Sequence, residues 1–262
     1  GGLTTGVYGL SSVLVPPVAN VMIRNWGVSA AFQIIAVCFA VVLLLASAFV
    51  EQGPEEAGQM LPGGGRDMSW REMLCQKKFY GMCAMLLCGG LSGMMVISSA
   101  SDMAQVEAGF SPAAAALMVS VLSLFNAGGR ASAGILSDKL GRIGTLSLVF
   151  PISVAALCAL FFFGQDSMAV FAVSIALVGA CFGALMGIFP GFTADEFGQR
   201  NNTVNYGILF FGFALSGMLG PQVASWVMSG TGSYRSAFLI AAVVALAGFA
   251  LTFLHRRLAA RS

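Results

Sequence analysis

Charged residues are scarce in this sequence. Asp, Glu, Lys and Arg make up 9% of the 262 residues and hydrophobic residues make up 58%, whereas an ordinary soluble domain has about 25% charged residues. So few charges cannot cover a water-facing surface, and the mean hydropathy of +0.87 indicates that lipid surrounds most of the chain. The net charge of +2 is small and the basic residues form no stripe, so we expect no nucleic-acid partner.

Metal-ligating and catalytic clusters are also missing from the sequence. His255 is the only histidine, and the six cysteines form no CxxC pair. Without a group of His, Asp or Glu inside an apolar stretch, or a paired nucleophile and base, the sequence predicts no enzymatic activity. We therefore expect no metal and no cofactor, and we interpret the cysteines as small side chains that suit a membrane.

Long apolar stretches separated by polar breaks are the main feature that is present. Each reaches the roughly 20 residues that cross a hydrocarbon core, and none shows the period-two alternation of a barrel strand. The fold class is therefore predicted to be all-α integral membrane, with eight transmembrane helices. The predicted spans are residues 3–23, 28–50, 79–104, 111–136, 143–164, 167–191, 204–228 and 233–255.

One connection between the predicted spans is much longer than the others. Residues 51–78 contain two prolines, a run of three glycines and nine charged side chains, a composition typical of a linker. The linker predicts two bundles. Residues 1–50 supply the last two helices of the first bundle, and residues 79–262 form the six helices of the second with a short tail.

Basic residues are distributed unequally between alternate connections. Ten Lys and Arg residues fall in the connections on one side and two on the other. Because cytoplasmic loops are enriched in Lys and Arg, the side with ten is predicted to be cytoplasmic, and it includes the linker and the C-terminus. We expect an integral protein of the bacterial cytoplasmic membrane.

The two ends of the chain contain a weak repeat. Residues 16–32 and 221–238 each include a proline in a helix, a short turn with an aromatic residue and a helix that opens with Ala-Phe. Six predicted helices separate equivalent points, which indicates two parallel six-helix halves in a twelve-helix protein. Since the chain opens at Gly1, without Met and within an apolar stretch, we expect the first four helices to precede it.

Arg130 is the most informative single residue, because it lies inside the predicted span 111–136. An arginine at this depth is costly and usually faces a protein interior or a water-filled cavity. None of the eleven acidic residues lies in the middle of a predicted span. One interpretation is that Arg130 binds an anionic substrate, whose carboxylate its fork matches, and that Asn126 one turn earlier orients it. The alternative is that Arg130 extends to the cytoplasmic interface or pairs with an acid on another helix.

A polar motif follows Arg130 at the cytoplasmic end of the same span. A helix end, a tight turn, one acid and two bases lie where they could pair with neighbouring helix ends. A positively charged loop alone would explain the charges but not their spacing. The motif positions are Gly134, Asp138, Lys139, Gly141 and Arg142. This spacing resembles the cytoplasmic loop signature of the major facilitator superfamily.

Within that superfamily, the chain resembles the oxalate:formate antiporter family and, more distantly, the monocarboxylate transporters. The resemblance covers essentially the whole chain and rests on residues 79–80, 93–97, 126–130, 137–142, 195–198 and 205–207. It implies a twelve-helix transporter fold, of which this chain holds the last eight helices. It also implies a carboxylate-binding arginine in the eighth helix, which is Arg130 in this sequence.

One departure from the resembled family concerns Phe213. The oxalate exchanger has a lysine at this place in its eleventh helix, and a second carboxylate that faced Phe213 would be desolvated without a partner. The departure favours a monocarboxylate such as formate, lactate or pyruvate over oxalate. Related monocarboxylate carriers often have an aspartate one turn before the arginine, and Asn126 at that position argues against proton coupling there.

Glycines recur every fourth residue in the predicted span 167–191. This spacing places them on one helix face, where they permit close helix contact and a bend near Pro190, although the same face would suit a static bundle. The four helix-packing glycines are Gly179, Gly183, Gly187 and Gly191. Tyr8 and Tyr206 are candidate cavity-lining hydroxyls, or else aromatic residues at helix interfaces.

Together these features predict alternating-access transport of a small organic anion near the middle of the membrane. Arg130 would bind the carboxylate, Asn126 would position it, and the helices with Phe213 and the four glycines would move around it. Two alternatives stay open: export of a lipophilic or cationic compound, with a structural Arg130, and a non-transporting membrane sensor of the same fold. We expect a monomer whose partners are the substrate and the lipid bilayer.

Overall fold

The computed structural model describes the backbone of residues 2–48 and 67–259. Side chains are described in the same ranges except at residues 2–14, 16, 17, 20, 258 and 259. The regular secondary structure of these ranges is entirely α-helical, which confirms the predicted all-α fold class. Seven helices of this part are long and apolar enough to cross a membrane. Most side chains of the first predicted span, residues 3–23, lie outside the described residues.

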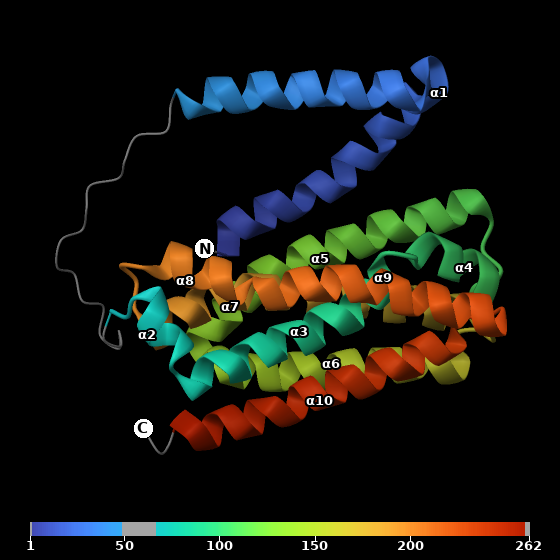
Figure 1. Ribbon diagram of the computed structural model, residues 1–262. Helices are drawn as coiled ribbons and strands as arrows, with labels where there is room; N and C mark the ends of the chain where they lie inside the picture. Colours follow the sequence, from blue (N-terminus) through green and yellow to red (C-terminus); the bar gives the residue numbers. More distant parts are fainter. Residues whose placement is uncertain (1, 49–66, 260–262) are drawn as a thin grey trace. The chain divides into compact units, whose positions relative to one another are not determined.

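Ten helices follow one another along the described chain (Figure 1). Their bounds are α1 (Gly2–Ser47), α2 (Trp70–Leu74), α3 (Lys77–Ile97), α4 (Ala100–Ala108), α5 (Pro112–Leu140), α6 (Arg142–Phe163), α7 (Met168–Phe197), α8 (Asn202–Leu209), α9 (Phe211–Thr231) and α10 (Arg235–Ala259).

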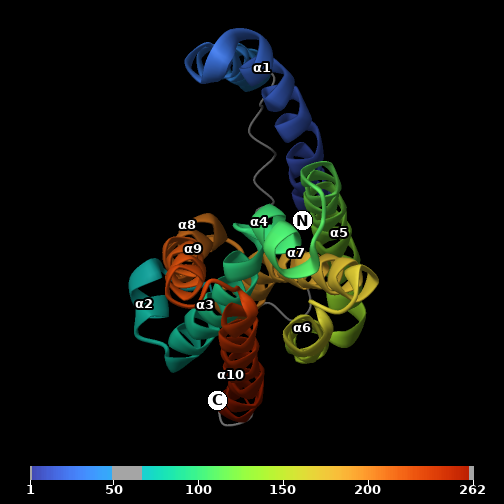
Figure 2. The ribbon, with the colours of Figure 1, turned by 90° about the vertical axis from the view of Figure 1, so that its right-hand side faces the viewer.

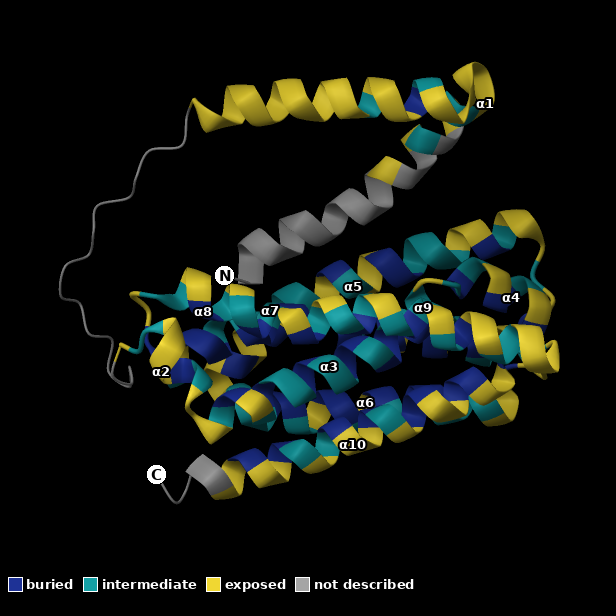
Figure 3. Cartoon of the chain, viewed as in Figure 1, coloured by how far each residue is buried: buried dark blue, intermediate teal, exposed yellow. Residues whose placement is uncertain are grey.

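The helix α1 consists of two helices that join at Gly27. The φ of Gly27 is 79°, in the left-handed region, and it interrupts the helical path. Gly232, in the corresponding turn of the sequence repeat, also has a positive φ, 70°, and ends α9. Both turns therefore use glycine for a backbone conformation that other residues avoid. Residues 11–63 form one compact unit, in which residues 28–47 are exposed almost throughout (Figure 3).

The second compact unit contains residues 64–262, together with residues 1–10. In it, α3, α5, α6, α7, α9 and α10 run in alternating directions and form one bundle (Figure 1). α7 packs against α5, α6 and α3 at the centre of this bundle (Figure 2). α7 is apolar around its circumference over most of its length, and it is the most buried of the seven spans. A helix of this kind is expected at the centre of a bundle.

The two ends of the bundle contain different loops and charges. We call one the motif end, because it holds the turn between α5 and α6, together with the start of α3 and the ends of α7 and α10. The α4 end holds α4 and the turns between α6 and α7 and between α9 and α10. Among the described basic residues of this unit, eight lie at the motif end, Arg235 lies at the α4 end, and Arg130 lies between.

The predicted span 79–104 is wrong at its C-terminal end, because the helix in the structure is shorter than the prediction. Its helix, α3, stops at Ile97, where two consecutive serines follow. The hydroxyl of Ser98 donates to the carbonyl of Met94 at 2.7 Å, and serine hydroxyls compete with backbone N–H groups for such carbonyls. The chain then restarts as the short helix α4.

Other predicted spans differ in their ends. The predicted span 204–228 is divided into α8 and α9, which join at Phe210. α5 continues to Leu140 rather than 136, so Asp138 and Lys139 lie in its last helical turn and not in a loop. α7 continues to residue 197 rather than 191.

The last part of the predicted linker, around Met68, is hydrogen-bonded to the bundle. The N–H of Met68 donates to the carbonyl of Phe197 at 2.9 Å. The carbonyl of Met68 accepts from the side-chain amides of Asn201 and Asn205, each at 3.1 Å. These bonds hold the chain before α2 against the turn between α7 and α8. Residues 51–66 of the predicted linker lie outside the described residues.

Candidate functional site

Arg130 lies in the interior of α5, one turn after Asn126. Nε of Arg130 donates a hydrogen bond to Oδ1 of Asn126 at 3.0 Å, and both side chains are half-buried. Eighteen residues of α5 precede Arg130 and ten follow it, which correspond to about 27 and 15 Å of helix at ~1.5 Å per residue. The bond to Asn126 therefore orients one edge of a guanidinium that lies well inside the span.

Tyr206 and three phenylalanines form a row of aromatic rings that runs from α8 into α9 and on to α7. Tyr206 lies in α8 and is half-buried. The ring of Tyr206 lies 5.5 Å from that of Phe210, between centroids, and Phe210 lies 4.6 Å from Phe213. Phe213 in turn lies 5.8 Å from Phe182 of α7. We call these four rings, Tyr206, Phe210, Phe213 and Phe182, the aromatic row.

Phe213 therefore belongs to a continuous row of rings that begins at Tyr206. Its side chain is half-buried, and its neighbours are aromatic rings on two helices, α8–α9 and α7. Tyr8, the remaining predicted substrate-binding residue, lies outside the residues whose side chains are described.

The helix-packing glycines of α7 face α5 along the segment that carries Asn126 and Arg130. A Cβ at Gly183 would overlap the carbonyl oxygen of Asn126, and on the other helix a Cβ at Gly129 would overlap the carbonyl of Ala180. No side chain fits between the two backbones, so their contact fixes the position of α5 on α7. The contacts repeat every fourth residue: Gly179 with Leu122, Gly183 with Asn126 and Gly187 with Arg130.

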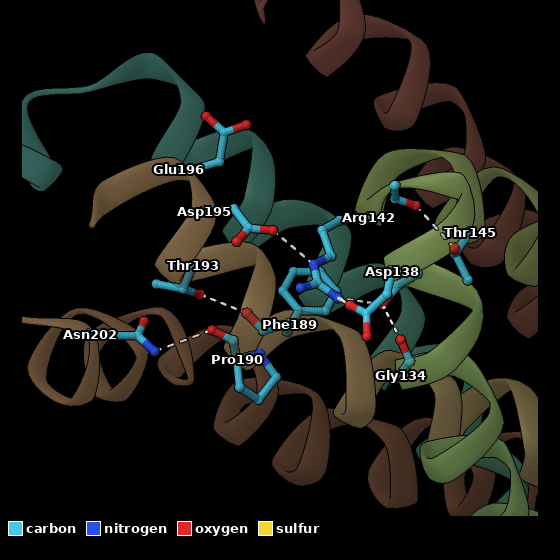
Figure 4. A network of polar contacts seen from close by, with 12 residues as sticks. Gly134, Asp138, Arg142, Thr145, Phe189, Pro190, Thr193, Asp195, Glu196 and Asn202 are labelled. Carbon is cyan, nitrogen blue, oxygen red and sulfur yellow. Dashed lines mark hydrogen bonds and ion pairs between the residues drawn. The ribbon is translucent and has the colours of Figure 1, made fainter. Parts of the chain in front are cut away.

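Arg142 joins three helix ends at the motif end (Figure 4). Nη1 of Arg142 donates to Oδ1 of Asp138 at 2.8 Å and to Oγ of Ser137 at 2.5 Å. Its Nε donates to Oδ2 of Asp195 at 2.8 Å. Asp138 belongs to α5, Arg142 begins α6 and Asp195 lies in the last turn of α7. We call Arg142, Asp138 and Asp195 the Arg142 cluster; Lys139, also in the motif, is exposed.

Two glycines of the motif have backbone roles. Gly141 has a φ of 77°, which allows the tight turn between α5 and α6. The carbonyl of Gly134 accepts a hydrogen bond from the hydroxyl of Ser137 at 2.8 Å. On α7, a Cβ at Gly191 would lie 3.0 Å from Nη2 of Arg142. The glycine face that contacts Arg130 thus continues to the Arg142 cluster.

A second polar cluster at the motif end is not predicted by the sequence analysis. Oε2 of Glu196 lies 3.3 Å from Nζ of Lys78, and Oε1 lies 3.4 Å from Nε2 of His255. Two consecutive acids, Asp195 and Glu196, at the end of an apolar stretch were the available signal. They bind different partners, on α6 and on α3 and α10.

Glu107 forms a third cluster, at the α4 end, and it is also missing from the predicted site. Its buried carboxylate accepts from Oγ of Ser233 at 2.9 Å, from the N–H of Tyr234 at 2.5 Å and from Nε2 of Gln165 at 2.5 Å. Burial raises the pKa of the Tyr234 hydroxyl, and the charges of Asp102 and Glu107 raise it further. Glu107 therefore joins α4 to both turns of this end.

One groove between two helices offers no group that would bind a carboxylate. A groove of about 510 Å³ lies between α6 and α7, and no charged residue lines it. Its lining consists of small and apolar side chains from residues 152–159 and 169–177. Among the described residues, no group of three or more His, Cys, Asp or Glu side chains could hold a metal ion.

Comparison with known proteins shows which family this chain belongs to. A protein-family model described as Major Facilitator Superfamily matches residues 2–221 of this chain. The chain belongs to the Major Facilitator Superfamily. This match confirms the resemblance drawn from the loop motif, and it explains the bundle of long apolar helices.

The relatives of this chain include two proteins that are named as carboxylate transporters. The Oxalate:formate antiporter of Oxalobacter formigenes is 26% identical, over 98% of this chain and 62% of its own length. YhjX of Escherichia coli, described as an uncharacterized transporter of the superfamily, is 29% identical over 80% of this chain and 52% of its own length. Monocarboxylate transporter 12 of Xenopus laevis is 27% identical over 56% of this chain and 31% of its own length.

Solved structures of the superfamily share the fold. The fucose:proton symporter FucP of E. coli superposes with a TM-score of 0.65 at 15% sequence identity, over 90% of this chain and 55% of the symporter. A second FucP structure, in an outward conformation, gives the same TM-score over 87% of this chain. These matches confirm the major facilitator fold. The chain spans about half to three-fifths of the length of its first two relatives named above.

Proposed function

We propose that this chain is part of a secondary active transporter that carries a small organic anion by alternating access. The substrate is a monocarboxylate such as formate, lactate or pyruvate. Membership of the superfamily supports transport, and two relatives are named for carboxylates, the oxalate:formate antiporter and Monocarboxylate transporter 12. The observation that carries the proposal is the guanidinium of Arg130, inside a membrane span and oriented by Asn126.

The chemistry of Arg130 suits a carboxylate. Two N–H groups of a guanidinium bind the two oxygens of a carboxylate in one plane. The bond from Nε to Asn126 holds the plane of this fork in one orientation. An arginine at this depth is costly in hydrocarbon, which favours a site that faces an aqueous cavity. Tyr206, which is half-buried in α8, would donate its hydroxyl to the same anion.

The aromatic row favours a substrate with a single charge. Phe213 lies between Phe210 and Phe182 and offers no hydrogen-bond donor. A second carboxylate at this place would lose its hydration without a partner, at a cost of several kcal/mol. A methyl or keto group would contact the rings without that cost. The row therefore supports lactate or pyruvate over oxalate.

The contact between α5 and α7 supports their movement as one body. Their backbones touch at Gly183 and Gly187, and the Arg142 cluster joins their motif ends. In alternating access of this kind, the site lies between the two bundles, and one bundle moves as a body against the other around it. In this proposal the motif end is cytoplasmic, because it carries eight basic residues.

The proposal is tested by uptake of radiolabelled formate, lactate, pyruvate and oxalate into proteoliposomes that contain the intact carrier. Arg130→Gln keeps a polar side chain and removes the charge. We expect monocarboxylate uptake to fall about 30-fold or more, since removal of one partner from a buried charge pair costs about 2–5 kcal/mol. Arg130→Lys keeps the charge without the fork, so its uptake should be intermediate.

Arg71→Gln is the matched control, because Arg71 lies on the exposed surface of α2 and stacks on the ring of Trp70. Its uptake should equal that of the parent. Uptake by folded Arg130→Gln within about twofold of the parent contradicts the proposal. Transport of lipophilic cations that carboxylates do not inhibit would favour an exporter, and anion binding without flux would favour a sensor.

A further inference from the structure

The residues just before α2, residues 67–69, lie against the turn between α7 and α8, and we call them the strap. Oδ1 of Asp67 accepts from the backbone N–H of Arg200 at 3.2 Å. Met68 adds its three hydrogen bonds, to the end of α7, to the turn and to α8. The bonds that involve side chains join residues 133 or 137 positions apart in sequence. The strap, which is part of the predicted linker, is therefore bonded to a distant part of the bundle.

Gly198 leaves the space that Asp67 occupies in this contact. A Cβ at Gly198 would overlap Oδ1 of Asp67 and would lie 2.6 Å from its Cα. The φ of Gly198 is 89°, in the left-handed region that other residues avoid. Rotation of a side chain cannot relieve a contact with a Cα atom. The turn after α7 therefore has room for the backbone of the strap only because this position has no side chain.

The short helix α8 depends on the strap for part of its attachment to the bundle. Of its eight residues, Asn205 and Leu209 are buried. Asn205 is 0% exposed, and its Nδ2 donates to the carbonyl of Met68 at 3.1 Å. Without the strap, this amide group would lose its acceptor, which is costly for a buried donor. The helix α2, which follows the strap, also lies beside α8 (Figures 1 and 2).

The other end of the Asn205 amide opposes this docking. Its Oδ1 is buried and has no hydrogen-bond partner in the part of the chain that the structure describes. A buried acceptor without a donor is costly, so the bonds of the strap are partly offset by this oxygen. Such a balance suits a contact that forms and breaks as the carrier changes conformation.

Asn205 is also the neighbour of Tyr206, the first ring of the aromatic row. Both residues belong to α8, which ends at Leu209 and joins α9 at Phe210. Because a helix of eight residues moves as one piece, a shift of Asn205 displaces Tyr206 with it. The strap therefore contacts the same short helix that carries the tyrosine of the candidate site.

We propose that Asn205 is a positioning residue, through which the strap sets the position of α8 and of the Tyr206 hydroxyl. Residues 11–63, the other compact unit, precede the strap in the chain. A movement of that unit reaches α8 along the backbone of the linker, and it releases or tightens the strap. The role of Tyr206 in anion binding rests on the proposed function, but the effect of the strap on α8 does not.

Docking of the strap is measured by amide hydrogen exchange in the intact carrier, from peptides that cover residues 67–70 and 198–202. Asp67→Ala removes the acceptor of the Arg200 N–H, and Asn205→Ala removes a donor to Met68. We expect exchange in both peptides to become about fivefold faster or more in each variant, because local opening is easier after the loss of a bond. Asp67 is exposed, so its variant tests the strap even where Asn205→Ala does not fold.

Asn202→Ala is the matched control for Asn205→Ala. Asn202 lies in the same helix, and its Oδ1 is likewise buried without a partner among the described residues. Its Nδ2, however, donates to the carbonyl of Pro190 at 3.3 Å and not to the strap. Exchange in the peptide that covers residues 67–70 should therefore stay within about twofold of the parent.

The position of Tyr206 is measured by fluorine NMR of the intact carrier labelled with 3-fluorotyrosine, without substrate. The Tyr206 signal is assigned by its loss in Tyr206→Phe. We expect Asp67→Ala and Asn205→Ala to shift this signal, and Asn202→Ala to leave it closer to the parent position. An unshifted signal in variants whose strap exchanges faster overturns the proposal. Strap peptides that exchange equally fast in the parent and in both variants also overturn it.

The effect on the anion is measured as the KM and kcat of monocarboxylate uptake. We expect Asn205→Ala to raise the KM about threefold or more and to have no further effect on the KM in the Tyr206→Phe background, because it acts through that hydroxyl. A shifted Tyr206 signal with an unchanged KM would contradict the role of Tyr206 in anion binding and leave the strap in place. If the parent shows no uptake at all, the proposed function fails, and the exchange and NMR measurements still decide the strap.

Discussion

Gly183 of α7 lies so close to the backbone carbonyl of Asn126 that a Cβ at position 183 would overlap its oxygen. The side chain of the same Asn126 accepts from Nε of Arg130 at 3.0 Å. The position of the guanidinium relative to α7 therefore depends on a residue that has no side chain. This contact connects the helix-packing glycines to the candidate anion site.

Gly183→Ala should disturb both the packing and the site. The new methyl group forces α5 away from α7, and overpacking of this kind costs about 1–3 kcal/mol of unfolding free energy. Because Asn126 and Arg130 move with α5, we expect the affinity for a monocarboxylate to fall about tenfold or more, as misplacement by about 1 Å is costly for positioned groups. Thermal unfolding and equilibrium binding in detergent measure the two effects.

Gly230→Ala is the control for this substitution. Gly230 lies in α9 near the α4 end, it is exposed, and a Cβ there meets nothing within 4 Å. Alanine in an exposed helical position should leave the unfolding free energy within about 1 kcal/mol of the parent or raise it. If Gly183→Ala binds the substrate as tightly as Gly230→Ala, the contact between α5 and α7 does not position the site.

The Arg142 cluster should show non-additive energetics. The side chains of Asp138 and Asp195 are 69% and 51% exposed, so Asp138→Asn and Asp195→Asn should each lower the unfolding free energy by less than about 1 kcal/mol. The guanidinium keeps one carboxylate in each single variant and none in the double variant. We therefore expect the double variant to lose about 0.5 kcal/mol or more beyond the sum of the two losses.

A double-mutant cycle under denaturing detergent measures this coupling. Lys139→Gln supplies the reference, because Lys139 lies in the same motif but is exposed. It should combine additively with either aspartate substitution. Additivity within about 0.3 kcal/mol for Asp138→Asn with Asp195→Asn would show that the two carboxylates do not share Arg142 in solution.

The helical fold could be predicted because it depends on length and polarity. Apolar stretches that span a bilayer must be helical to satisfy their backbone groups, and the structure has these helices in the expected order. The break after Ile97 was missed because a hydropathy window averages over two serines. The extension of α5 to Leu140 was missed for a related reason, since Asp138 and Lys139 lower hydropathy without ending a helix.

The candidate site was predictable where its contacts are local. Asn126 and Arg130 are four residues apart, so helix geometry alone brings them together. The partners of Glu107 are 58, 126 and 127 residues away, and those of Glu196 include His255 at a separation of 59. Only the packing of whole helices brings such residues together, and no local pattern encodes it.

Glu107 should contribute strongly to stability at the α4 end. Glu107→Ala leaves three donors at this buried site without their acceptor. An unsatisfied buried donor costs about 1–3 kcal/mol, and water can reach some of these donors in the variant. We therefore expect the unfolding free energy to fall by about 2–4 kcal/mol in total. Glu107→Gln keeps one acceptor oxygen and should lose less. Asp102→Asn, on the same short helix but exposed, should change the unfolding free energy by less than about 0.5 kcal/mol. Equal melting temperatures for Glu107→Ala and Asp102→Asn would exclude this role.

Phe213→Lys should change the preference between mono- and dicarboxylates. The substitution removes ring contacts with Phe210 and Phe182 and places an ammonium among aromatic rings, so we expect a loss of about 2–4 kcal/mol in unfolding free energy. In the proposed site, a cation at position 213 would pair with the second carboxylate of oxalate, and the ratio of oxalate to formate uptake should rise about tenfold or more. Phe213→Met keeps an apolar side chain and should leave this ratio as in the parent. A charge that faces the anion must alter the selectivity of the carrier. A folded Phe213→Lys with an unchanged uptake ratio would therefore show that Phe213 does not face the substrate. A parent that already prefers oxalate would show the same.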